Sequence, residues 1–186
     1  MISTAQLWLP ILLTGAGVFI ASSLIHIVLK WHNSDYSKLT NEDEVRAALG
    51  RGKPAPGIYI VPHCPDMKDL QSPEMQKKFV EGPVGFITVR ASGMPTMGPH
   101  LAKWFGLNLL VAAGIAHLAS FALVAGAPGI RVFHVFAIAT FLAYGAGAVS
   151  DGIWTGRPWG AVSRDLLDAL IYAVVSGLIF AWLWPH

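Results

Sequence analysis

Charged side chains are scarce in this sequence, since Asp, Glu, Lys and Arg make up 13% of its 186 residues. Soluble domains carry about 25%, so the deficit argues against a soluble globular protein. The net charge is only +2, which gives no electrostatic basis for binding nucleic acid. The single cysteine, Cys64, excludes a disulfide within the chain. Internal repeats and low-complexity tracts are also lacking.

Apolar residues, in contrast, make up 54% of the chain and gather in four long runs. A helix that crosses a bilayer needs about 20 predominantly apolar residues. Apart from Asp168, the runs hold no Asp, Glu, Lys or Arg, and they cover residues 6–28, 104–125, 132–149 and 166–184. The sequence therefore predicts an all-α membrane protein with four transmembrane helices. The first run lacks a preceding basic segment and a following cleavage pattern, so we interpret it as a span rather than a signal peptide.

The remaining polar segment predicts a small α+β insertion between the first two spans. Helical signals cover 41–50 and 72–82, where acidic first turns, Ser72 and Pro73 favour helix starts. Strand signals cover 58–61 and 84–90.

Two short strands are marginally stable in water. The insertion is therefore expected to contact the membrane surface or a partner, through Tyr59, Phe79 or Phe86. The predicted organisation is 1–30 as transmembrane helix 1, 31–103 as the insertion, and 104–186 as transmembrane helices 2–4.

Lysine and arginine are distributed unequally between the two sides of the predicted bundle. Because cytoplasmic loops carry the excess of these residues, we expect the insertion and the 150–165 connection to be cytoplasmic and both termini to be periplasmic. One basic residue, Arg131, lies on the other side. The predicted cytoplasmic residues are Lys30, Lys38, Arg46, Arg51, Lys53, Lys68, Lys77, Lys78, Arg90, Lys103, Arg157 and Arg164.

Polar residues recur at helical spacing inside three spans and become denser toward the cytoplasmic ends. Such residues are functional suspects in a membrane helix, and here they predict a cluster of His26, Tyr144, Asp151, Asp168 and Tyr172. One interpretation is a proton or ion relay, or a pocket for a small polar ligand. The alternative is structural, with hydrogen bonds between helices and carboxylates at a helix start.

Sulfur and imidazole groups gather in two short stretches, "PHCPDM" and "GMPTMGPH". Thiolate and thioether groups favour Cu(I) or Zn²⁺, so a candidate metal set comprises His63, Cys64, Met67, Met94, Met97 and His100. No standard ligand spacing occurs, and the prolines and glycines are equally typical of turns. A haem ligated by His117 and His134 would require two ligands at different depths in the bilayer. We therefore predict no cofactor, with copper or haem as the alternatives.

The 150–165 connection combines aromatic and cationic residues and forms a second candidate surface. Arginine can bind phosphate or carboxylate groups through two parallel hydrogen bonds, and tryptophan is enriched at bilayer interfaces. Trp154, Arg157, Trp159 and Arg164 are thus expected to contact a lipid headgroup or a partner subunit, or simply to anchor an interfacial loop.

Two stretches, "EGPVGFITVRASGMPTMGPHLAKWF" and "SDGIWTGRPWGAVSRDLLDALIYAVVSGLIFAWLWP", carry a resemblance that extends over nearly the whole chain. In them the chain resembles a group of uncharacterised small bacterial inner-membrane proteins with four spans. The resemblance implies a bacterial inner-membrane location and no activity, and it transfers no catalytic residue.

Three functional hypotheses follow. Because the sequence contains no catalytic constellation, the leading one is a non-enzymatic accessory subunit of a larger bacterial membrane complex, respiratory or photosynthetic, bound to lipids and other subunits. The second is a small transporter, channel or proton-coupled factor that uses the polar cluster. The third is a membrane copper or redox protein.

Overall fold

The computed structural model describes residues 2–186, which form two compact units, 2–36 with 96–186 and 37–95. Within the described residues, four helices are long and apolar enough to cross a membrane. A two-stranded sheet lies in the segment between the first and second of them. The predicted fold class, an α-helical membrane protein with a small α+β insertion, is therefore confirmed.

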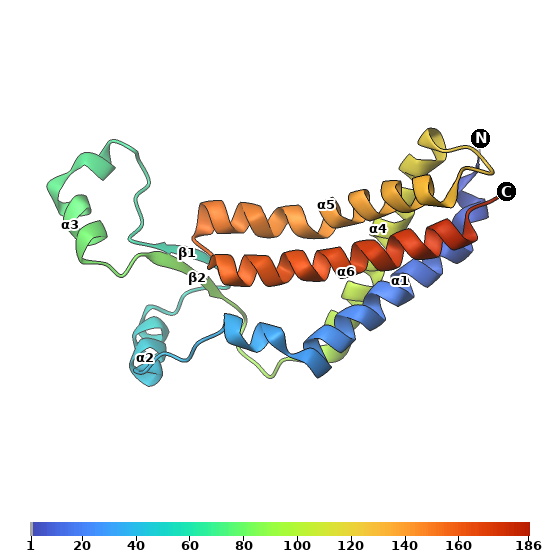
Figure 1. The fold of residues 1–186 in the computed structure, drawn as a ribbon. Coiled ribbons are helices and arrows are strands. Elements are labelled where there is room, and N and C mark those ends of the chain that lie inside the picture. Colours follow the sequence, from blue (N-terminus) through green and yellow to red (C-terminus); the bar gives the residue numbers. More distant parts are fainter. Residues whose placement is uncertain (1) are drawn as a thin grey trace. The chain divides into compact units, whose positions relative to one another are not determined.

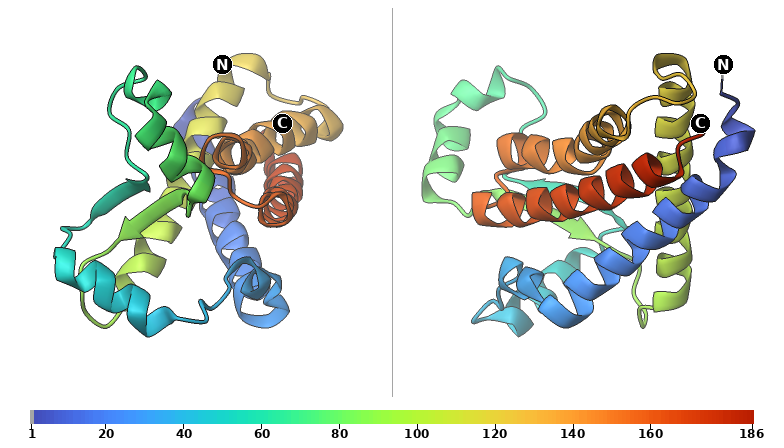
Figure 2. Two further views of the ribbon diagram at one scale, coloured as in Figure 1. Left: turned by 90° about the vertical axis from the view of Figure 1, so that its left-hand side faces the viewer. Right: turned by 45° about the vertical axis from the view of Figure 1, so that its right-hand side comes forward.

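The first unit is a bundle of four membrane-length helices. Its first helix is built from three successive pieces, the 3-10 turn η1 (Thr4–Leu7), α1 (Trp8–Ser23) and the π-helical η2 (Leu24–Leu29), and is followed by the 3-10 turn η3 (Trp31–Asp35). The others are α4 (Met97–Ala122), α5 (Gly129–Thr155) and α6 (Trp159–Leu183). Helices α5 and α6 run side by side, and both chain ends lie at one end of the bundle (Figures 1 and 2).

Helices α4, α5 and α6 extend beyond the apolar runs that predict them. Helix α4 begins at Met97 rather than near Trp104, and the 150–165 segment, expected to be a loop, is mostly helix. Only a short connection that includes Gly156, at a φ of +70°, separates α5 from α6. Hydropathy marks the stretch that matches lipid, whereas a helix can continue into the polar headgroup region, so the polar helix ends were missed.

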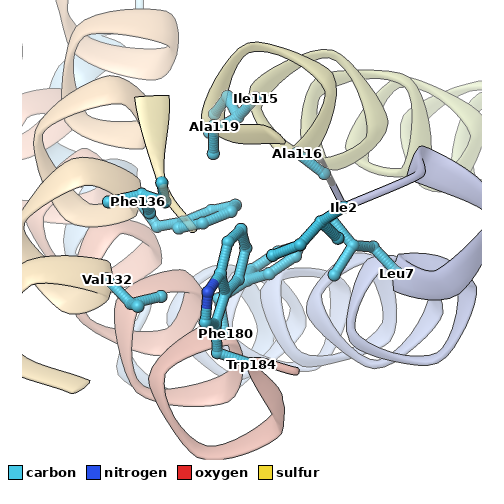
Figure 3. Close-up of a cluster of buried hydrophobic side chains, with 10 residues drawn as sticks. Ile2, Leu7, Ile115, Ala116, Ala119, Val132, Phe136, Phe180 and Trp184 are labelled. Carbon is cyan, nitrogen blue, oxygen red and sulfur yellow. The ribbon is translucent and has the colours of Figure 1, made fainter. Parts of the chain in front are cut away.

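An apolar core fills the end of the bundle where the two termini lie. Phe136 of α5 and Phe180 of α6 are fully buried and stack with ring centroids 3.7 Å apart. Trp184 packs edge-on against Phe136 and donates a hydrogen bond from Nε1 to the carbonyl oxygen of Val124 (3.0 Å). Figure 3 shows these rings meeting Ile2, Leu7 and three small or branched residues of α4. This end is closed by packing, so any polar cavity must lie elsewhere.

The second unit contains α2 (Glu42–Gly52), β1 (Gly57–Val61), the 3-10 turn η4 (Asp69–Gln71), α3 (Pro73–Glu81) and β2 (Gly85–Val89). Strands β1 and β2 pair antiparallel, with Tyr59 opposite Ile87. The predicted order of elements is confirmed. Helix α3 begins as expected, because the Ser72 hydroxyl accepts a hydrogen bond from the amide of Met75 (3.3 Å).

The second unit has no hydrophobic core of its own. None of the residues 37–95, all of which the structure describes, is buried. Every residue of β1 is exposed, and Phe86 of β2 is 46% exposed. Apolar burial is the main favourable term in folding, and this unit obtains little of it from its own residues.

Candidate functional site

A cavity of about 730 Å³ opens in the half of the bundle opposite the apolar core. It lies entirely within the first unit. All five members of the sequence-predicted polar cluster line it: His26, Tyr144, Asp151, Asp168 and Tyr172. Residues that stand up to 146 positions apart, in helices η2, α5 and α6, thus share one cavity, as their helical spacing suggested.

The sequence missed the segment that completes this site. Lys30 adopts a left-handed backbone conformation, φ +52°, and its amide bonds to the carbonyl oxygen of Ile25 (2.8 Å). This ends the π-helical turn and reverses the chain, so that η3 folds back onto α6. Single π-helical turns often occur at functional sites, and here the turn carries His26.

Asp168 is the most enclosed of the carboxylates that line the cavity, with a side chain 8% exposed. It accepts hydrogen bonds from Trp31 Nε1 (3.1 Å) and from His32 Nε2 (3.0 Å). The Tyr172 hydroxyl lies 3.5 Å away, at the limit of a hydrogen bond. Buried charge is tolerated when it is paired and hydrogen-bonded, and η3 supplies both conditions.

Asp35 holds His32 from its other side. Its Oδ2 accepts a hydrogen bond from His32 Nδ1 (2.7 Å), and its Oδ1 accepts one from Arg164 Nε (2.6 Å). The Asp35 side chain is only 5% exposed. The result is a continuous chain of charged groups from Arg164 through Asp35 and His32 to Asp168.

The pKa values of the two inner groups of this chain, His32 and Asp35, are shifted in opposite directions. Burial lowers the pKa of His32, but hydrogen bonds to Asp35 and Asp168 and the two negative charges more than compensate, so the pKa lies above its ordinary value. Burial raises the pKa of Asp35, but hydrogen bonds and charges from His32 and Arg164 outweigh it and leave that pKa below its ordinary value. Both shifts favour the charged form of the group, the imidazolium of His32 and the carboxylate of Asp35.

The wall of the cavity is acidic. Asp151, Asp165 and Asp168 line it, and Arg157 is the one lysine or arginine among the residues that line it. Arg157 pairs with Asp165 through a close contact of its Nη1. Arg157 compensates Asp165 and His32 faces Asp168, so the three carboxylates still leave the wall with an excess of negative charge, which favours cations over anions.

Aromatic residues form the inner wall. Trp104 meets Tyr144 and Tyr172 with ring centroids 5.9 and 6.4 Å apart, and the Tyr144 hydroxyl donates to Asn108 Oδ1 (2.9 Å). The buried Trp104 Nε1, however, has no hydrogen-bond partner within the described chain. Leaving a buried donor unsatisfied costs about 1–3 kcal/mol.

The candidate lipid or partner surface divides into two kinds of residue. Trp154 and Trp159 are 78% and 60% exposed. Arg157 and Arg164 instead form ion pairs within the chain, with Asp165 and Asp35. The partner of Arg164, Asp35, lies 129 residues away in the sequence.

The sulfur-rich candidate set does not form one site within either unit. His63, Cys64, Met67 and Met94 belong to the second unit, whereas Met97 and His100 belong to the first. Met67 and Met94 are 78% and 92% exposed. The Cys64 thiol donates to the carbonyl oxygen of Asp66 (3.1 Å), which closes a local turn. The two haem candidates, His117 and His134, lie on exposed faces of α4 and α5.

A different set of metal-ligating groups does come together. Ligand atoms of His26, His32 and Asp168 all lie within 4.8 Å of one another. The rings of His26 and His32 stack, with centroids 4.7 Å apart and planes 10° from parallel. His32 lies immediately after the first span, three residues before Asp35. This pair is the sequence signal that could have indicated the group.

No family model, no curated protein and no solved structure matches this chain.

Proposed function

We propose that this protein is a small multi-pass membrane protein that binds a cation in the acidic cavity, as a transporter, channel or proton-coupled factor. The observation that carries the proposal is the convergence of five polar side chains from three helices on one cavity of about 730 Å³. Ionisable residues inside membrane helices are costly and usually face a water-filled cavity or pathway. The excess of carboxylates on the wall favours a cation.

Asp168 is the residue on which this function depends most. It is buried, it faces the cavity, and it joins the cavity to the His32–Asp35–Arg164 chain. A proton or metal cation that enters the cavity can bind the Asp168 carboxylate in place of the hydrogen bonds that it accepts. Such a group couples binding to the position of η3, because Trp31 and His32 both contact it.

Flux through proteoliposomes tests the proposal. The purified chain is reconstituted into liposomes that contain pyranine, a potassium diffusion potential is imposed, and proton uptake is followed, with radioactive sodium as a second probe. We expect cation uptake above that of protein-free liposomes, lost in Asp168→Asn and retained in Asp69→Asn, which changes an acid of the second unit. Uptake equal to that of empty liposomes with both probes would refute the proposal.

We further propose that the membrane is a bacterial inner membrane, with residues 31–103 cytoplasmic and both termini periplasmic. The asymmetric distribution of lysine and arginine supports this orientation, and the resemblance to small bacterial inner-membrane proteins supports the location. Cys64 provides the test, since it is the chain's single thiol. In intact cells it should react with a membrane-permeant maleimide and resist an impermeant one.

A second candidate function, an accessory subunit of a larger membrane complex, is favoured by the coreless second unit. Its exposed strands provide a surface that a partner subunit would cover. Mild solubilisation from the native host, followed by size exclusion and mass spectrometry, should then recover a fixed set of proteins at constant stoichiometry. Phe86→Ser should release that set, whereas Lys77→Ser should not. Recovery of the lone chain or a homo-oligomer would contradict this candidate.

A further inference from the structure

We propose that His26, His32 and Asp168 bind a divalent first-row transition-metal ion, of which Zn²⁺ is the best match, at the edge of the acidic cavity. The inference rests on the proposed function, since this ion is the cation that the cavity would take. Imidazole ligands suit zinc and its neighbours, whereas magnesium and calcium prefer oxygen ligands alone. Two imidazoles and one carboxylate also leave a coordination position open, as in exchangeable zinc sites.

The hydrogen bonds on the far side of each imidazole support the assignment. His26 Nδ1 donates to the carbonyl oxygen of Ser22 (2.9 Å), and His32 Nδ1 donates to Asp35 Oδ2 (2.7 Å). In metal sites, a ligating histidine almost always donates its other ring N–H to a backbone carbonyl or a carboxylate, which fixes the tautomer and the ring orientation. Both histidines therefore have Nε2 as the available ligand atom.

Asp35 is itself held in place, as the outer shell of a metal site requires. Arg164 binds its Oδ1 and leaves Oδ2 directed at His32. The carboxylate therefore acts as a positioning group rather than as a ligand. A purely apolar contact between helices would not need an ordered carboxylate hydrogen-bonded to a histidine.

The distances require a small closure of the site. Ligand atoms about 2.1 Å from a tetrahedral zinc ion lie about 3.3 Å apart. His32 Nε2 and Asp168 Oδ2 already lie 3.0 Å apart, and the whole group fits within 4.8 Å. His26 must therefore approach by at most about 1.5 Å relative to that tetrahedral spacing, and its ring must turn out of the stack with His32 so that both Nε2 lone pairs point at the ion. Its side chain is exposed on the π-helical turn, so this movement displaces no buried neighbour.

Binding exchanges one proton for the metal. His32 donates from Nε2 to Asp168 in the metal-free protein, so the metal replaces that proton, which leaves to solvent through the cavity. The Nε2 lone pair and an Asp168 oxygen then both bind the ion, and the Nδ1–H bond to Asp35 is kept. No redox change occurs, and water fills the open position.

Cobalt provides the probe, because tetrahedral Co²⁺ gives visible d–d absorption where Zn²⁺ gives none. The full-length chain, purified without a histidine tag and freed of metal with a chelator, is titrated with Co²⁺ and then with Zn²⁺. We expect one Co²⁺ per chain and its displacement by Zn²⁺. His26→Gln, His32→Gln and Asp168→Asn should each weaken binding at least 100-fold.

Two further variants distinguish the roles of the surrounding groups. Asp35→Asn should weaken binding by about 10- to 100-fold while keeping the same absorption band, because it positions a ligand without touching the metal. Cys64→Ser should change nothing. Loss of metal binding in His26→Gln cannot be explained by misfolding, because the side chain that it replaces is exposed. Circular dichroism and size exclusion check the fold of every variant.

Two outcomes would overturn the site: no stoichiometric Co²⁺ binding, or binding that persists in His32→Gln and Asp168→Asn. The flux assay separates this failure from failure of the proposed function. Proton or sodium uptake that depends on Asp168 without Co²⁺ binding removes the metal site and keeps the cation pathway. Stoichiometric Co²⁺ binding without any uptake supports the metal site and removes transport.

Discussion

The bond between Arg164 and Asp35 makes a quantitative prediction, because it fastens η3 to α6. Arg164→Met removes the guanidinium and keeps most of the apolar stem, which leaves Asp35 with His32 as its remaining charged partner within hydrogen-bonding distance. Breaking a buried ion pair costs about 3–5 kcal/mol. The Arg164 side chain is 27% exposed, and His32 still compensates Asp35, so we expect the lower cost of a lost charged hydrogen bond, about 2–3 kcal/mol.

Hydrogen exchange at the amides of residues 31–35 measures this cost locally. A loss of 2–3 kcal/mol corresponds to about 30- to 150-fold faster opening. The matched control is Arg157→Met, whose pair with Asp165 is more exposed, with side chains 31% and 24% exposed. Such a pair contributes about 0–1 kcal/mol. Equal exchange rates in the two variants would refute the conclusion that Arg164 anchors η3.

Two further predictions concern helix packing. A Cβ atom at Gly177 would lie 2.6 Å from the Phe133 ring and 3.0 Å from its carbonyl oxygen, so Gly177→Ala should destabilise the bundle by about 1–3 kcal/mol in detergent unfolding. Gly147→Ala, which meets no atom within 4 Å, should leave the unfolding midpoint unchanged, and equal midpoints would contradict this account. Ser176→Ala removes the 3.0 Å bond from Thr140 and should cost about 0.6 kcal/mol and no more than about 1.7; a larger loss would show a wider network.

Hydropathy and helical spacing predict the features that depend on local sequence. Four apolar runs give the four spans, and the spacing of Tyr144 and Asp151 along one helix, and of Asp168 and Tyr172 along another, brings those residues to one cavity. Small residues predict close helix contacts less reliably. Of the two neighbouring glycines in α5, Gly145 faces α6, while Gly147 faces open space.

The missed features depend on one backbone reversal. A π-helical turn followed by a left-handed lysine is not encoded by any composition signal, since left-handed conformations favour glycine. Yet that reversal brings Trp31, His32 and Asp35 onto α6. Asp35 and Arg164 are 129 residues apart, so their pairing is a property of the assembled bundle.

The most direct test of the central claim asks whether the cavity is wet and attracts cations. Ala148 lines it, and in a Cys64→Ser background Ala148→Cys introduces one thiol there. Its rate with a cationic methanethiosulfonate, divided by its rate with an anionic one and normalised to free cysteine, should exceed ten and fall toward one in Asp168→Asn with Asp151→Asn. A ratio near one in both backgrounds, or reactivity no greater than that of a cysteine at lipid-facing Leu142, would contradict a cation-binding cavity.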